Sequence, residues 1–483
     1  MNLSNSLTTL LIVLGLIGPA YGDDPQIVTV KVTVDLAKAV GTVPELGIGL
    51  GVAVWDDHMT DKEVPALIRN AGVSIIRYPG GSYADIYHWK ANAATPGTHA
   101  TILPQDDFEH FVKLLHATKT QALITVNYGS NVDGTGGGDP QEAADWVKYA
   151  NVDHKYGIEY WEIGNEVYGN GEYGAKWEED LHADKSPSEY GRNVNAFAKA
   201  MKAVDPSVKI GAVLTGPDSW PDGRPPAWNP AVLGECGKNI DFVVVHWYPD
   251  QGGQTNIFEA SVANIPNIGT KARVLVDQYC RPGTPIWISE GDATGGTMQV
   301  QGALFAADLY PRIWENGIES FDWWDLHNGL DVSDEGRFSD QGILSNASCA
   351  KSICEPVVNT PFPPYYGIKL VHYFSTPGDT LVEVKSDAPS VIAHAVLKAG
   401  GKVVGLMLIN KDPRKTAEVT VDAGSVSLGQ ADIRYSYGRN SKDIETTGGD
   451  GLVGTSARLG VVKLPPYSVT VLIAPELSSQ VAE

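Results

Sequence analysis

Positive charge is scarce in this chain. Its 483 residues include 36 Lys and Arg against 58 Asp and Glu, so the formal net charge is −22 at pH 7. Nucleic acids and anionic membrane surfaces repel a chain of this sign, and we therefore expect neither as a partner. The balance fits a soluble enzyme that acts on neutral polymers.

Cysteine is scarce as well, and the four residues are Cys236, Cys280, Cys349 and Cys354. No CxxC pair or nearby histidine cluster accompanies them, which argues against a zinc site. An even number in an exported chain permits two disulfides, with three possible connectivities. Cys349 and Cys354 are close enough to staple a local loop, and Cys236 and Cys280 would then pair with each other.

Long apolar runs are missing after the N-terminus, so the sequence predicts no transmembrane helix. The run Leu7–Ile17 is too short to span a membrane, and Ala20 and Gly22 follow it at positions suited to signal peptidase. No Lys or Arg precedes the run, so a disordered N-terminus with an apolar patch is the alternative. We interpret residues 1–22 as a secretory signal and expect a secreted or periplasmic protein that leaves the membrane after cleavage.

The middle of the chain alternates apolar, strand-like runs with helical patterns, starting at Leu46. Two helix starts are predicted, at Asp139-Pro140-Gln141-Glu142 and Ser186-Pro187-Ser188-Glu189. Each has an N-cap residue, a proline in the first turn and a glutamate three residues after the cap. Eight strands alternating with helices predict an α/β fold, the (β/α)8 TIM barrel. The eight predicted strands are residues 46–55, 74–77, 122–127, 160–165, 209–214, 241–247, 285–289 and 320–324.

The texture after Pro377 is all-β, with short alternating runs between glycine-rich turns, and predicts a small sandwich. Gln26–Leu36 alternates valine with polar residues, so we expect this early strand to join the sandwich. The predicted organisation follows. It is a signal peptide at 1–22, a joining strand segment at 23–44, a catalytic (β/α)8 barrel at 45–376 and a C-terminal antiparallel β-sandwich at 377–483.

Two of the barrel strands run into a glutamate, Glu166 after the fourth and Glu290 after the seventh. These strands face each other, and the carboxyl ends of barrel strands carry catalytic groups. Two carboxyls about 5–5.5 Å apart could cleave a glycosidic bond with retention, one donating a proton and the other attacking the anomeric carbon. A surface salt bridge is the usual interpretation of one glutamate, but two at corresponding strand ends favour a site.

Several motifs carry a family resemblance that covers nearly the whole mature chain. Trp161-Glu162-Ile163-Gly164-Asn165-Glu166 resembles the acid/base fingerprint of clan A retaining glycoside hydrolases. Motifs of the family 51 α-L-arabinofuranosidases are similar to Arg77-Tyr78-Pro79-Gly80-Gly81, His246-Trp247-Tyr248, Tyr365-Tyr366 and Leu464-Pro465-Pro466-Tyr467-Ser468.

The resemblance implies a role for each matching residue. Glu166 would be the general acid/base and Glu290 the nucleophile, and the chemistry would need no metal or organic cofactor. Asn165 would hydrogen-bond the 2-hydroxyl of the sugar. Arg77 and Tyr248 would keep Glu290 ionised and oriented, because a cation and a donor both favour a carboxylate.

Histidine and tryptophan complete the predicted site. His246 would line it near the acid/base, although a histidine satisfied within the core is the alternative. Trp323 and Trp324 end the eighth strand, and one of two adjacent residues must face the barrel wall. We favour Trp324 as the platform on which a sugar ring stacks.

Three positions depart from the family pattern. Ser82 stands where the family has asparagine, Trp55-Asp56-Asp57-His58 where it has a substrate-binding glutamate, and Gly291 where an aromatic residue follows the nucleophile. We predict an exported retaining hydrolase of plant-type polysaccharide or oligosaccharide, α-L-arabinofuranosidase-like. The departures leave open an endo-β-glycanase of glucanase type, and a catalytically silent carbohydrate-binding protein is a further alternative.

One acidic loop offers a possible cation site. Asp331, Ser333, Asp334 and Glu335 could bind calcium, but a solvated loop over the rim of the barrel is the simpler interpretation.

Overall fold

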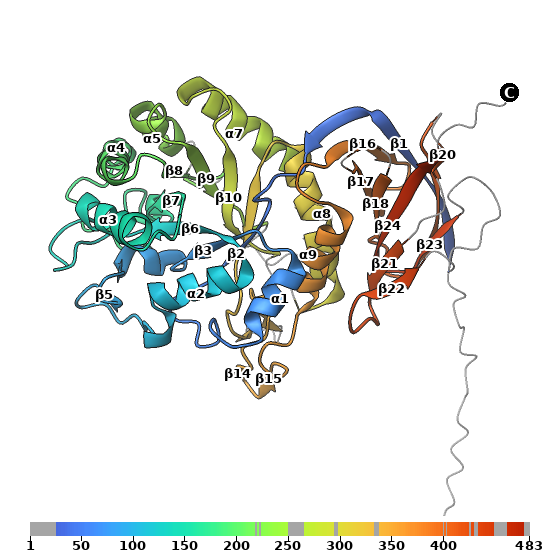
Figure 1. Ribbon diagram of the computed structural model, residues 1–483, viewed down its shortest axis with the longest axis horizontal. Helices are drawn as coiled ribbons and strands as arrows, with labels where there is room; N and C mark the ends of the chain where they lie inside the picture. Colours follow the sequence, from blue (N-terminus) through green and yellow to red (C-terminus); the bar gives the residue numbers. More distant parts are fainter. Residues whose placement is uncertain are drawn as a thin grey trace, which may run out of the picture.

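The computed structural model describes residues 26–217, 220–221, 224–249, 265–293, 298–332, 338–398, 400–401, 403–424, 427–428, 433–448 and 461–477. The predicted signal peptide lies outside these ranges. Within them, a closed barrel ringed by helices lies beside a large curled sheet (Figure 1). None of the helices in these ranges has the length and apolar character that crossing a bilayer requires.

Eight parallel strands close the barrel, which confirms the predicted (β/α)8 fold. Each observed strand overlaps its predicted run. In barrel order they are β2 (Ile48–Gly51), β3 (Ile75–Tyr78), β6 (Gln121–Val126), β7 (Tyr160–Ile163), β8 (Lys209–Leu214), β9 (Phe242–His246), β10 (Ile286–Gly291) and β11 (Ser320–Trp323). They are almost entirely buried, because helices cover the outside of a parallel barrel and side chains fill its inside.

In the part of the chain that the structure describes, an α-helix follows each barrel strand. The helices are α1 (Val64–Ala71), α2 (Phe108–Thr118), α3 (Pro140–Val147), α4 (Pro187–Val204), α5 (Trp228–Cys236), α7 (Ile265–Tyr279), α8 (Val300–Glu315) and α9 (Pro363–Phe374). The predicted caps are present. Asp139 accepts a hydrogen bond from the backbone N–H of Gln141 at 2.8 Å, and Ser186 from that of Glu189 at 3.3 Å. These bonds satisfy N–H groups that the first turn leaves free.

The second layer is the sheet drawn on the right of Figure 1. Its strands are β1 (Ile27–Thr42), β16 (Thr380–Ser386), β17 (Val391–Leu397), β18 (Val403–Asn410), β19 (Thr416–Asp422), β20 (Ser427–Leu428), β21 (Ile433–Gly438), β22 (Glu445–Gly448), β23 (Val462–Leu464) and β24 (Ser468–Leu477). The sheet curls around a separate apolar core, which confirms the predicted sandwich.

The N-terminal strand β1 pairs antiparallel with β16 and parallel with β19, so it completes a sheet whose other strands come from the far end of the chain. Val30, Val32 and Val34 are buried, and the residues between them are exposed. The alternation of valine and polar residues thus orients β1 with one face in the core.

One of the two predicted disulfides is present. Cys349 and Cys354 are bonded and staple the hairpin of β14 (Cys349–Ala350) and β15 (Ile353–Cys354). The predicted Cys236–Cys280 bond is wrong, because both are buried free thiols. Cys236 lies in the last turn of α5 and donates to the carbonyl of Val232, and burial raises the pKa of both thiols, which disfavours the reactive thiolate.

The calcium interpretation of the loop after the eighth strand stays a prediction. Ser333, Asp334 and Glu335 lie outside the described residues, as do the surroundings of the Asp331 side chain.

A buried ionic cluster joins the barrel to the sandwich. Asp308 of α8 accepts from Arg312 at 2.7 Å, from His394 of β17 at 3.0 Å and from Lys411 at 2.5 Å, while His394 also contacts Glu315 at 2.8 Å. Burial opposes the charge on Asp308, but its cationic neighbours hold the pKa of this carboxyl well below its ordinary value. One aspartate therefore neutralises side chains from both layers.

Replacing this aspartate should weaken the whole molecule. Asp308→Asn leaves buried cations without a counter-charge, and we expect the free energy of unfolding to fall by about 3–5 kcal/mol. Urea denaturation followed by tryptophan fluorescence measures the change. The control is Asp153→Asn, which removes an ion pair to Lys148 whose two side chains are 56% and 43% exposed. An equally small effect of both substitutions would show that the cluster does not couple the layers.

Candidate active site

Glu166 and Glu290 emerge at the carboxyl ends of β7 and β10, on the same end of the barrel. Glu290 still belongs to β10, whereas Glu166 follows β7 by three residues. Gly164 has φ 75° and Glu166 φ 38°, and this left-handed stretch turns the chain into the short helix η4 (Val167–Gly169). A Cβ at Gly164 would lie 2.7 Å from Val167, so the turn requires glycine there. The backbone of Glu166 itself is strained, as residues at functional sites often are.

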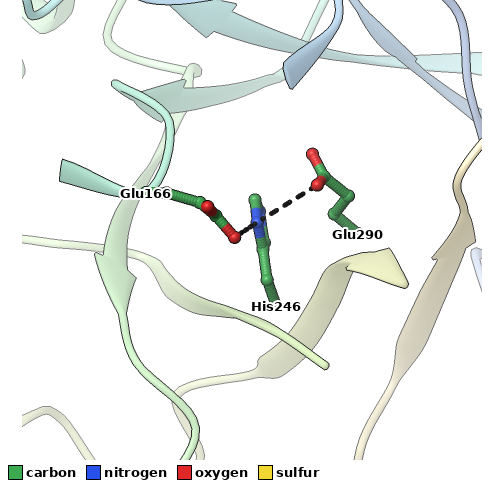
Figure 2. A group of neighbouring side chains, drawn as sticks. All are labelled: Glu166, His246 and Glu290. Atoms are coloured by element: carbon green, nitrogen blue, oxygen red, sulfur yellow. Dashed lines mark hydrogen bonds and ion pairs between the residues drawn. The ribbon is translucent and has the colours of Figure 1, made fainter. Parts of the chain in front are cut away.

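His246 stands between the two carboxylates (Figure 2). Its Nδ1 lies 2.9 Å from Oε1 of Glu166 and 3.6 Å from Oε1 of Glu290. Burial would lower the pKa of His246, but Glu290, Glu162 and Glu166 raise it to about 10. The ring is therefore an imidazolium at neutral pH, which keeps two carboxylates close without mutual repulsion.

Glu166, His246 and Glu290 also have the spacing of metal ligands. One ligand atom from each lies within 4.8 Å of the others. Arg77 and the protonated His246 already supply positive charge to the two carboxylates. Cationic side chains thus already balance the charge of the two glutamates.

Arg77 of β3 holds Glu290 and connects it to two neighbours. Its Nη1 donates to Glu290 at 2.8 Å, its Nη2 to Asn165 at 2.7 Å and its Nε to Glu162 at 2.7 Å. Tyr248 donates its hydroxyl to the other oxygen of Glu290 at 2.8 Å. The guanidinium is 1% exposed and rigid, so these bonds fix the direction in which Glu290 points.

Glu162 is a site residue that sequence reasoning missed. It is fully buried and accepts from Arg77, from Thr125 at 2.7 Å and from Ser289 at 3.0 Å. Burial works against its charge, but Arg77 and His246 lower the pKa of Glu162 to about 2. A charged residue inside the apolar run of the fourth strand was the available signal, since such a residue needs a buried partner.

Asn165 is clamped from both sides. Its side-chain oxygen accepts from Arg77, and its Nδ2 donates to Glu178 at 2.9 Å. Ser82, the departure from the family pattern, donates to the same oxygen of Glu178 at 2.6 Å. The backbone N–H of Asn165 is bound by Asp85 at 3.1 Å. The bond to Glu178 uses one of the two hydrogens of the Asn165 amide.

The adjacent tryptophans point in different directions, as two neighbours at a strand end must. Trp323 is fully buried and packs edge-on against Phe305 of α8. Trp324 is only half buried and lies over Gly51 and Gly81, where an added Cβ would come within 2.9 Å and 3.1 Å of its ring. The glycine pair of the Arg77–Gly81 motif thus makes room for the Trp324 indole.

The position of the missing family glutamate is occupied by a structural pair. Asp56 is buried and contacts Nδ1 of His327 at 2.9 Å. The other nitrogen of His327 contacts Asn359 at 2.9 Å. Both residues therefore hold loops together. Asp56 does not act as a shorter substitute for the family's substrate-binding glutamate.

Two further donors contact Glu166, and sequence reasoning missed both. The Tyr168 hydroxyl donates to Oε1 at 3.0 Å, and the Trp177 indole N–H donates to Oε2 at 2.7 Å. Burial would raise the pKa of Glu166, but the bonds from His246, Trp177 and Tyr168 lower it. Trp177 is 44% exposed, and its loop offered no periodic or motif signal.

The sequence comparisons find arabinofuranosidases among the similar proteins. No family model matches the chain. A probable α-L-arabinofuranosidase C of Aspergillus fumigatus is 28% identical over 200 residues, 35% of this chain and 35% of the relative. An exo-α-(1→6)-L-arabinofuranosidase of Bifidobacterium longum is 27% identical over 220 residues, 40% and 38% of the two chains. The matched segment thus spans well under half of these curated relatives.

Solved structures match over almost the whole chain. An α-L-arabinofuranosidase of Thermotoga maritima has a TM-score of 0.68 at 17% identity, covering 93% of this chain and all of the other. A family 44 xyloglucanase of Paenibacillus polymyxa also has 0.68, at 16% identity, covering 92% and 99%. The chain thus shares the fold of these two glycoside hydrolases. In sequence it is similar to α-L-arabinofuranosidases.

The lowered pKa of Glu162 makes a prediction about acid stability. In the folded protein the pKa of Glu162 is about 2, below the ordinary 4.5. The ionised carboxylate therefore stabilises the fold above pH 4.5, and this stabilisation is lost as the pH falls toward 2. It amounts to about 3 kcal/mol. We expect wild type to exceed Glu162→Gln in thermal stability at neutral pH, with the gap shrinking on acidification.

The measurement is the melting temperature of both proteins from about pH 7 to about pH 3. Glu63→Gln serves as the control because the Glu63 side chain is 52% exposed. A Glu162→Gln gap that stays constant with pH, like that of the control, would rule out the ionised buried glutamate.

Proposed function

We propose that this protein is a retaining glycoside hydrolase that removes α-L-arabinofuranosyl groups from plant-type polysaccharide or oligosaccharide. The observation that carries the proposal is the convergence of Glu166 and Glu290, whose oxygens lie within 4.8 Å in the set with His246. Retention uses carboxyls about 5–5.5 Å apart, whereas inversion needs about 6.5–9.5 Å to admit a water. The resemblance to arabinofuranosidases supports the choice of sugar.

The first step joins the sugar to Glu290. The Glu290 carboxylate, held by Arg77 and Tyr248, attacks the anomeric carbon while protonated Glu166 donates its proton to the glycosidic oxygen. The carbon–oxygen bond breaks, its electron pair leaves with the alcohol, and a glycosyl ester remains on Glu290. Asn165 offers its free N–H to the 2-hydroxyl, a contact that strengthens in the transition state.

The second step releases the sugar. Glu166, now a carboxylate, removes a proton from a water that attacks the same carbon. The ester bond to Glu290 breaks and the product keeps its anomeric configuration. His246 contacts both carboxylates, so its charge stabilises whichever of them is ionised at each stage.

An endo-β-glycanase is the second candidate function. The xyloglucanase likeness equals that of the arabinofuranosidase, and Asp56 and Ser82 do not supply the family's substrate-binding groups. A screen of aryl glycosides and intact polysaccharides separates the two. Release of single pentose units from chain ends or branches supports the first function, whereas a rapid fall in polymer viscosity supports the second.

We also propose that the protein is exported. The apolar run followed by small residues at positions 7–22 supports export. The Cys349–Cys354 disulfide supports it too, because such bonds persist in oxidising compartments.

The two glutamates should differ in how azide rescues them. Glu166→Ala should lose about 10²–10⁴-fold on substrates with poor leaving groups and far less on activated aryl glycosides, which need no proton. Azide should then attack the glycosyl ester and yield a glycosyl azide of retained configuration. Glu290→Ala cannot form the ester, so azide can only attack directly and give the inverted product.

Rates and product configuration by proton NMR, with and without azide, check both variants. Glu166→Gln and Glu290→Gln, at wild-type melting temperature, serve as controls for folding and should both lose most turnover. A retained azide from Glu290→Ala together with an inverted one from Glu166→Ala would reverse the two roles.

A further inference from the structure

The loop after Glu166 is built to bring one tryptophan back to it. The backbone N–H groups of Trp177 and Glu178 both donate to the carbonyl of Gly169, at 3.0 and 3.2 Å, and Asn170 bridges Lys176. A Cβ on Gly169 would lie 2.4 Å from the Trp177 indole, so the ring rests directly on that glycine. The loop thus holds the indole N–H of Trp177 within hydrogen-bonding distance of Glu166.

The hydrogen bond from Trp177 opposes the proposed role of Glu166 as a general acid. In the structure, Glu166 accepts three hydrogen bonds, which suits a carboxylate and opposes protonation. The first chemical step needs a proton on one of its oxygens, directed at the glycosidic oxygen. Oε1 is bonded by Tyr168 and His246, whereas Trp177 is the one described residue that donates to Oε2, so Oε2 is the oxygen to protonate.

Trp177 is also the donor that can leave. Tyr168 is 6% exposed and His246 7% exposed, and both are packed in place, whereas Trp177 is 44% exposed. An exposed indole face also gives a leaving-group sugar a surface to lie against. Trp220 borders the ring at 5.2 Å between centroids.

We propose that Trp177 is a positioning residue that holds Glu166 ionised in the free enzyme and gives up its place at Oε2 to the glycosidic oxygen when substrate binds. The acid therefore forms only in the complex. Oε2 takes up a proton from solvent as the indole withdraws, and passes it to the leaving alcohol as the glycosidic bond breaks. The inference rests on the proposed function and deepens it.

Other titratable groups also face Glu166. They come from β9 and its end, from β10 and from the returning loop. They are His246, Tyr248, Glu290, Tyr168 and Glu178. Trp177→Phe leaves all of these in place and removes the N–H donor while keeping an aromatic ring at the position, so it tests the contribution of that donor.

The test compares the pH dependence of kcat/KM, which reports the free enzyme, with that of kcat, which reports the complex. The probe is methyl α-L-arabinofuranoside, whose leaving group needs the proton. Without the indole N–H the carboxylate is less favoured. The basic limb of kcat/KM for Trp177→Phe should therefore move up by about one pH unit, while that of kcat stays in place.

Trp220→Phe is the matched control, because this neighbour makes no hydrogen bond to Glu166 and should move neither limb. If the basic limb of kcat/KM does not move in a Trp177→Phe variant of wild-type melting temperature, Trp177 only packs against its neighbours and does not position Glu166. Equal shifts in both limbs would show that the indole stays bound in the complex, which overturns the exchange.

A substrate-free measurement separates failure of this inference from failure of the proposed function. In protein carrying ¹⁵N-tryptophan, the indole resonance lost in Trp177→Phe identifies Trp177. Its shift should follow the titration of Glu166 and lose that pH dependence in Glu166→Gln. An indole resonance indifferent to pH would contradict the contact, whether or not the wild type hydrolyses any furanoside.

Discussion

The buried guanidinium of Arg77 is the constraint on which the site depends. It comes from β3 and reaches groups of β7, the turn after β7 and β10, namely Glu162, Asn165 and Glu290. Two buried carboxylates around one cation would be unstable without full hydrogen bonding. The second cation, His246, completes the balance and extends it to Glu166. Charge compensation thus sets where the reacting oxygens lie.

The barrel strands hold these charged side chains in place, and the loops add further contacts to them. Parallel strands place their carboxyl ends together, so side chains from four strands converge without long connections. The loop of residues 167–178 then returns to its own starting point. It brings Glu178 to Asn165 and Trp177 to Glu166. Residues of this loop thus add contacts to the two residues that end the Trp161–Glu166 motif.

Much of this arrangement could be predicted from patterns of short range. The alternation of strands and helices indicated the barrel, and the strand-end glutamates indicated where chemistry would occur. Sequence reasoning missed Glu162, Glu178 and Trp177. Their roles come from contacts across strands or loops, which a local sequence pattern does not reveal. The Cys236–Cys280 disulfide failed for a related reason, since cysteine number is a poor guide to how two buried thiols point. Trp324 was separable from Trp323 only by the rule that neighbours on a strand alternate.

The central claim is that Glu290 becomes covalently attached to the sugar. The most direct measurement uses Glu166→Ala with an activated aryl α-L-arabinofuranoside, in which the ester forms but breaks down slowly. Peptide mass spectrometry after rapid acid quenching should find one pentosyl group on the peptide that contains Glu290, and fragmentation should place it on that residue. A pentosyl group on another side chain, or turnover with no labelled peptide at any time point, would contradict the account.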